Sequence, residues 1–119
     1  MKSEALIQKE IQLALSKAGC IMWRNESAGV WAGRILFKQA RQVTLDNASF
    51  IKSGLCVGSS DLIGLTPCGR FLAVEVKTPK GKPTDEQINF INAVNAKNGI
   101  GYIARSAEEA IKLLEEKIK

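Results

Sequence analysis

Two apolar runs joined by a short turn place the strongest constraint on the fold of this chain. Residues 61–65 and 71–77 are rich in β-forming side chains, and the proline and glycine between them favour a reversal of the chain. We therefore expect an antiparallel hairpin. If its turn is centred on Cys68, Asp61 lies opposite Glu75, because each stands seven positions from the centre. The sequence thus predicts that two acidic residues meet at the open end of this hairpin.

The sequence before the hairpin predicts one helix, one strand and a segment of ambiguous pattern. Apolar residues recur at helical spacing from Ser3, a good N-cap, to about residue 18. Residues 20–24 are typical of a strand. Residues 30–56 hold β-leaning pieces separated by polar residues, and they fit either a hairpin or a strand followed by a short helix.

The sequence after the hairpin predicts a helix, a strand and a closing helix. Thr84 can cap a helix that ends near residue 98, and residues 100–104 favour a strand. Ser106 and Glu109 have the spacing of a capping box at the start of the last helix. The 119 residues suffice for one compact domain, so we expect a single α/β domain over residues 1–119.

The composition removes several kinds of chemistry. The sequence contains no histidine, which excludes imidazole-based triads and histidine zinc sites, and its three cysteines form no CxxC pair. Catalysis would therefore rest on carboxylates, lysine and a metal ion. No apolar run approaches the length of a membrane helix, and residues 1–4 lead directly into an amphipathic pattern. We expect an intracellular, cytoplasmic protein that does not enter a membrane.

A third charged residue joins the acidic pair. Glu75 and Lys77 stand two apart on a strand, so their side chains leave the same face. Asp61 and Glu75 at close range repel each other and need a counter-charge. Carboxylate oxygens suit Mg²⁺ or Mn²⁺, which can polarise a phosphodiester and acidify a bound water. Lys77 would orient that water or the phosphate.

The first helix offers a further acid. At 100° per residue, Glu4 points close to the centre of the buried face, whereas Glu10 points toward the opposite margin. We therefore expect Glu4 to face the interior, where it would bind a second ion or hold a metal-bound water.

Each of these residues also has a simpler explanation. An isolated pair such as Glu75 and Lys77 is more often a solvated pair on an exposed strand, and Asp61 can simply begin a strand after a turn. Glu4 in a first helical turn complements the helix dipole. Gln87 stands three residues after Thr84, so it can complete a capping box.

Basic residues flank the candidate site in the sequence. The net charge is +5, which is a mild indication of a polyanionic partner. Lysines and arginines are concentrated in residues 23–58 and 70–82, on both sides of Asp61 and Glu75. We expect the phosphates of DNA to be contacted by Arg24, Asn25, Arg34, Lys80 and Lys82.

The ordered motifs resemble a known nuclease family. The matching pieces are Glu4-x-x-Ile7-Gln8, Trp23-Arg24-Asn25, Gly58-x-x-Asp61-Leu62, Glu75-Val76-Lys77-Thr78 and Gly81-x-x-Thr84-x-x-Gln87. Together they resemble the stand-alone virus-type replication-repair nucleases, the VRR-NUC family of the PD-(D/E)xK superfamily. One departure is Ser60, which stands where the family usually has proline. The resemblance implies a restriction-endonuclease-like αβββαβ core, with a mixed central sheet flanked by helices.

The resemblance also implies roles for individual residues. Asp61, Glu75 and the backbone carbonyl of Val76 would be ligands of Mg²⁺ or Mn²⁺. Lys77 would assist the attacking water, Gln87 would support the site, and Glu4 corresponds to the acid of the first helix. The implied reaction is metal-dependent hydrolysis of a phosphodiester bond in DNA.

Short members of this family are similar to Holliday-junction resolvases, which act as homodimers on four-way DNA junctions. Residues 30–51, with Trp31, Phe37 and Phe50, are the candidate dimer surface, although these aromatic residues fit a core equally well. Three alternatives remain open: a flap or single-strand DNA nuclease with the same site, a non-catalytic DNA-binding module, and a small structural or protein-interaction domain.

Overall fold

The computed structural model describes residues 1–25, 29–39, 42–52 and 55–119, and the side chains of residues 1–25 and 55–119. Helices and strands follow one another in the order that the sequence predicts. In chain order they are α1 (Glu4–Lys17), β1 (Ile21–Arg24), β2 (Gly29–Gln39), β3 (Gln42–Lys52), β4 (Leu62–Leu65), β5 (Phe71–Val76), α2 (Asp85–Ala96), β6 (Ile100–Ala104) and α3 (Ala107–Ile118).

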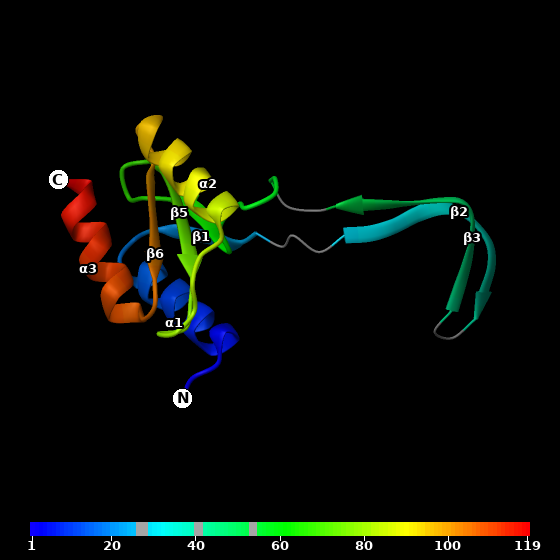
Figure 1. Cartoon of the computed structure of the whole chain (residues 1–119), viewed down its shortest axis with the longest axis horizontal. Coiled ribbons are helices and arrows are strands. Elements are labelled where there is room, and N and C mark those ends of the chain that lie inside the picture. The colour runs from blue at the N-terminus through cyan, green and yellow to red at the C-terminus, as the bar shows by residue number, and fades with distance from the viewer. Residues whose placement is uncertain (26–28, 40–41, 53–54) are drawn as a thin grey trace.

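A mixed four-stranded sheet forms the centre of the molecule (Figure 1). Its strand order is β1-β4-β5-β6; β4 is antiparallel to both β1 and β5, and β6 runs parallel to β5. With helices on both of its faces, this sheet confirms the α/β core expected from the sequence. Within the described ranges, no helix combines the length and apolar character needed to span a membrane.

The central hairpin has the predicted register. Leu62 pairs with Val74 and Leu65 pairs with Phe71, so each pair is symmetric about Cys68. Gly69 has a φ of +87°, a left-handed conformation that favours glycine, and it closes the turn. The turn residues therefore fix which side chains of β4 and β5 lie opposite each other.

The main core lies between one face of the sheet and two helices. Ser3 caps α1 by accepting a hydrogen bond from the backbone N–H of Leu6 at 3.2 Å. The apolar side of α1 then packs with α3 against the sheet. This core contains Ile7, Ile11, Leu15, Leu62, Leu72, Val74, Val76, Tyr102 and Leu114 among others. Alternate residues of β5 thus enter the core, and the residues between them face away from it.

Helix α2 covers the other face, over β5 and β6. Gly101 permits its close approach, because a Cβ there would lie 3.2 Å from the carbonyl oxygen of Ile91. The last helix departs slightly from the predicted capping box. The Ser106 hydroxyl accepts from the N–H of Glu109, but the Glu109 carboxylate accepts from the N–H of Arg105 at 2.8 Å. In a full capping box the Glu109 carboxylate would accept from the N–H of Ser106, so this hydrogen bond is shifted by one residue.

The ambiguous segment is a long hairpin, which we call the arm (β2 and β3). Its strands pair with each other in a sheet of their own, and the arm extends away from the body of the molecule in Figure 1. The principal extents of the molecule are 55 × 34 × 28 Å. Of the two interpretations of residues 30–56, the hairpin is correct. The side chains of Trp31, Phe37 and Phe50 lie outside the described residues, so the dimer surface stays a prediction.

Candidate active site

Asp61 lies against the strand that carries Glu75. The Oδ2 atom of Asp61 accepts a hydrogen bond from the backbone N–H of Val76 at 3.0 Å. This bond lies just beyond the last paired residues of β4 and β5, where the register would set Asp61 opposite Glu75. The two carboxyl groups predicted to meet are therefore brought together at the open end of the hairpin.

Asn25 fixes the backbone around Asp61. Its N–H donates to the carbonyl oxygen of Asp61 at 2.8 Å, and its side-chain amide donates to Ser59 Oγ at 2.7 Å and to Ser60 O at 2.9 Å. The end of β1 is thereby tied to the segment that enters β4. Because the side-chain amide makes two donor bonds inside the protein, Asn25 is suited to position Asp61. The side-chain atom left over is an oxygen, which accepts and so does not pair with a phosphate oxygen.

Glu75 is a buried acid without a compensating partner. Its residue is 1% exposed, and neither carboxylate oxygen has a hydrogen-bond partner among the described residues. Burial raises the pKa of Glu75 to about 9, the Asp61 carboxyl group and Glu4 add to the rise, and the Lys77 ammonium opposes it. A buried carboxylate of this kind is unfavourable unless a cation joins it. The donor set therefore fits a hard divalent ion.

Lys77 completes the group of charges. It is partly buried and follows Glu75 by two residues, on the same side of β5. The backbone N–H of Lys77 donates to the carbonyl oxygen of Ala104 at 3.1 Å, which continues the parallel pairing with β6. Strand pairing on both sides of β5 therefore fixes the backbone that carries Glu75 and Lys77.

The expectation that Glu4 faces the interior is wrong, because the structure leaves it exposed. The reason is its position on the helix: the first buried residue of α1 is Ile7, so the first turn lies beyond the core. Glu4 is nevertheless close enough to raise the pKa of Glu75. Among the side chains that the structure describes, no three acids or thiols gather into a ready-made metal cluster. The preformed part of the site is the pair Asp61 and Glu75.

Gln87 has the structural role that the sequence offered as its simpler explanation. Its Oε1 accepts from the N–H of Thr84 at 2.8 Å, and its own N–H donates to Thr84 Oγ1 at 3.2 Å. This complete capping box begins α2 directly after the segment that follows Lys77. The side-chain oxygen of Gln87 is thus engaged in the helix cap.

Arg105 is a site residue that the sequence analysis missed. Its Nη1 donates to the carbonyl oxygens of Thr78 and Gly81, both at 2.6 Å. These bonds hold the segment directly after Lys77. The contact follows from the parallel pairing of β5 with β6, which neither strand's sequence reveals alone. Val76 pairs with Ala104, so the next residues, Lys77 and Arg105, lie at the same level of the sheet.

The basic residues predicted to bind DNA lie on different elements. Lys80 follows β5, on the segment that Arg105 holds, and Lys82 comes just after it; both are exposed. Arg24 is exposed at the end of β1, where it pairs with Leu62. Arg34 belongs to the arm, and its side chain lies outside the described residues. The structure therefore brings Arg24 and Lys80 to segments that adjoin Asp61 and Lys77.

Comparison with known proteins agrees with this fold. The family model described as VRR-NUC domain matches residues 6–108. A solved structure titled "VRR_NUC domain" is similar in fold, with a TM-score of 0.58, 18% sequence identity and coverage of 94% of both chains. A search of curated protein sequences found no match.

Proposed function

The chain belongs to the VRR-NUC domain family of nucleases, and from this premise we propose that it is a metal-dependent DNA endonuclease. The observation that carries the proposal is the buried carboxylate of Glu75 beside Asp61, because such a pair calls for a cation. Asp61, Glu75 and the backbone carbonyl of Val76 would hold Mg²⁺ or Mn²⁺. These ions prefer carboxylate and carbonyl oxygens with water in the remaining positions.

The bound ion would polarise the scissile phosphate and lower the pKa of a water molecule. The residues of the chain have separate tasks around it. Asp61 presents a carboxylate that the N–H of Val76 orients, and Glu75 must lose its proton before it can act as a ligand. Lys77 donates hydrogen bonds to the attacking water or to the phosphate. Glu4, which is exposed at the rim, can accept a hydrogen bond from a water, and Gln87 supports the segment behind Lys77.

We propose DNA with a four-way junction as the substrate and a homodimer as the active form. Each copy carries one candidate site, so symmetric cutting of two strands needs two copies. The arm is the candidate contact between them, because an isolated two-stranded hairpin is only marginally stable in water. Arg24, Arg34, Lys80 and Lys82 would contact backbone phosphates. Asn25, whose amide donates to Ser59 and Ser60, would instead hold the segment next to this surface. The three cysteines are all free thiols, which supports action inside the cell.

A cleavage panel tests the proposal. Four-way, flap, duplex and single-stranded DNAs of equal length are incubated with the protein in Mg²⁺, in Mn²⁺ and in EDTA at one stated salt concentration. We expect cutting of the junction in either metal ion and none in EDTA. Preferred cutting of the flap or the single strand would replace the junction substrate while keeping the nuclease, and DNA binding without any cutting would indicate a non-catalytic module.

Two substitutions connect the activity to the site. Lys77→Ala and Asp61→Asn should abolish cutting while junction binding survives, because they alter the reacting centre and leave the basic surface in place. The matched controls are Lys112→Ala and Glu116→Gln, which change the same kinds of charge on the exposed side of α3. Undiminished cleavage by both site variants would refute the mechanism.

A further inference from the structure

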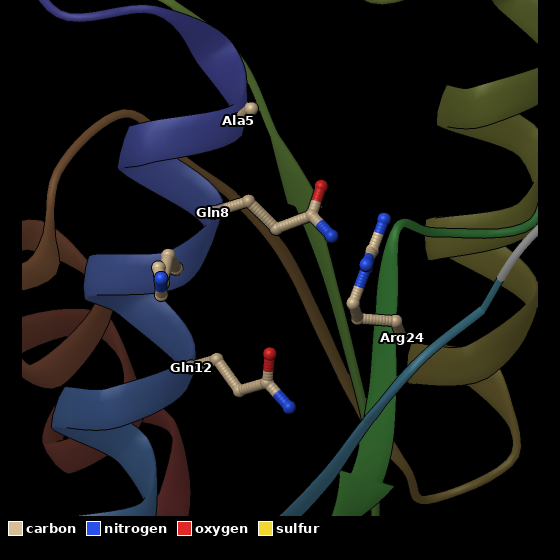
Figure 2. A pocket seen from close by; sticks show the side chains of 5 residues that line it. Ala5, Gln8, Gln12 and Arg24 are labelled. Atoms are coloured by element: carbon tan, nitrogen blue, oxygen red, sulfur yellow. The ribbon is translucent and has the colours of Figure 1, made fainter.

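A polar pocket lies between α1 and β1, outside the group of charges around Glu75. Its volume is about 280 Å³, and it is lined by Ala5, Gln8, Lys9, Gln12 and Arg24. Figure 2 shows the amide groups of Gln8 and Gln12 projecting from α1 toward the side chain of Arg24 on β1. The lining thus combines two amides and two cationic side chains, and none of its five residues is acidic.

The pocket is built from positions that the fold fixes. Gln8 and Gln12 stand four residues apart, so they lie one above the other on the same side of α1. The Nε2 atom of Gln12 donates to the carbonyl oxygen of Met22 at 3.3 Å, which links the helix to the strand that carries Arg24. Ala5, one turn nearer the start of α1 than Lys9, has no bulk to fill the opening.

These groups match the chemistry of a phosphodiester. A guanidinium group offers a planar fork of donors that suits phosphate oxygens, and amide N–H groups add neutral donors. Such contacts fix the register of a nucleic-acid strand without reading its sequence. A metal ion would meet two cationic side chains here, and an apolar ligand would meet a lining made mostly of charged and amide groups. The pocket is therefore suited to an anion with several oxygen acceptors.

The pocket adjoins the candidate active site along two elements. On α1, Gln8 lies one helical turn, about 5.4 Å, after Glu4, whose charge reaches Glu75. On the sheet, Arg24 pairs with Leu62, the residue after Asp61. From this placement, and on the basis of the nuclease function proposed above, we infer that the pocket binds a backbone phosphate of the DNA strand, next to the phosphate that is cut. Gln8 and Gln12 are then strand-positioning residues.

The substitution Gln8→Glu tests this site without removing any part of its wall. It places a carboxylate of the same shape in the lining, on the side of α1 that projects toward Arg24, so an internal anion competes with a phosphate for the cationic lining of the pocket. The attraction to Arg24 offsets the weak repulsion from Glu4 one turn before, so the melting temperature should stay within about 2 °C of the wild-type value. We expect the junction Kd, measured by fluorescence anisotropy in EDTA, to rise about tenfold. The slope of log Kd against log salt concentration should fall by about 0.9.

Two further variants separate this effect from a general change in charge. Asn92→Asp adds the same negative charge on the exposed side of α2, and it should change the Kd by less than about twofold. Gln8→Met removes the amide donors without adding charge, and it should weaken binding about threefold. The inference is overturned if Gln8→Glu binds the junction no more weakly than Asn92→Asp.

A neutral-phosphate scan identifies the bound group. Methylphosphonates, which replace one charged phosphate oxygen by a methyl group, are placed one at a time along the cut strand. At one position near the cut, the wild-type protein should lose about tenfold in affinity and Gln8→Glu should lose almost nothing, because its pocket is already occupied. Equal losses for both proteins at every position would refute a phosphate in this pocket.

The binding assay also separates this inference from the nuclease proposal. If the wild-type protein cuts DNA and Gln8→Glu binds and cuts equally well, the pocket is refuted and the nuclease stands. If neither protein cuts but Gln8→Glu still weakens binding with the expected change in salt slope, the pocket stands and the nuclease is refuted. A wild-type protein that binds no DNA would overturn both.

Discussion

The substitution Glu75→Gln should make the metal-free protein more stable at neutral pH, although it removes a proposed metal ligand. Glu75 is buried, and its pKa is raised from the ordinary 4.5 to about 9. At pH 7 the folded protein therefore keeps this carboxyl group protonated, whereas the unfolded chain ionises it. The contribution of this carboxyl group to the free energy of unfolding is most favourable below pH 4.5. It is lost as the pH rises toward 9, because over this range the unfolded state binds fewer protons than the folded state.

The size of the effect follows from the same pKa shift. The interval from pH 4.5 to pH 7 is 2.5 units, and each unit is worth about 1.4 kcal/mol, so Glu75 lowers the free energy of unfolding at pH 7 by about 3 kcal/mol. Glutamine has nearly the same shape and stays neutral at every pH. The variant should therefore gain up to about 3 kcal/mol at pH 7 and almost nothing at pH 4.

Urea unfolding in EDTA at the two pH values measures this difference. The control is Glu116→Gln, which neutralises an exposed carboxylate on α3 and should change the stability by less than about 0.5 kcal/mol. Adding Mg²⁺ at pH 7 should stabilise the wild-type protein and leave Glu75→Gln nearly unchanged. The reasoning would be refuted if the variant were no more stable than the wild type at pH 7, or if its advantage were the same at pH 4.

Three other predictions concern the same site. Between pH 7 and pH 9 the Mg²⁺ affinity should rise about tenfold per pH unit, because Glu75 must lose its proton on binding; calorimetry in two buffers of different ionisation enthalpy should detect that proton, and a pH-independent affinity would contradict the assignment. Arg105→Ala should slow cleavage at saturating DNA about tenfold and increase proteolysis near Gly81, since two hydrogen bonds to that segment are lost; unchanged rates would exclude a positioning role. Asn25→Asp should destabilise the protein by about 1–3 kcal/mol in urea unfolding, because it puts an acceptor where Ser59 Oγ and Ser60 O now accept; a smaller loss than for Asn92→Asp would contradict this.

The part of the site that the sequence predicted depends on local geometry. A turn centred on Cys68 sets the pairing of its two strands, so the approach of Asp61 to Glu75 follows from counting residues. The two-residue spacing likewise places Glu75 and Lys77 on one face. The fold class was predictable for a similar reason, because the order of helices and strands along the chain restricts how a sheet can be built.

The part that the sequence missed depends on contacts between distant segments. The contact of Arg105 with Gly81 requires knowledge that β6 lies parallel to β5, which neither strand reveals alone. The exposure of Glu4 depends on how far α1 extends beyond the core. The angular position of a residue on a helix predicts the side it faces but not whether the core reaches that turn. The arm was ambiguous because the apolar side chains of residues 29–52 do not alternate regularly with polar ones. Their pattern therefore does not distinguish a hairpin from a strand followed by a short helix.

The arm also has a consequence for how this protein can diversify. The chain departs from the sheet after Asn25 and comes back at Asp61, and one backbone hydrogen bond joins these two residues. The chain between them is therefore an insertion whose two ends are held together where the pairing of β1 with β4 ends. Loop-closure entropy grows slowly, by about 0.6 kcal/mol per doubling of length. Insertions and deletions between these two residues therefore cost little in loop closure and leave the backbone bond next to the candidate site in place.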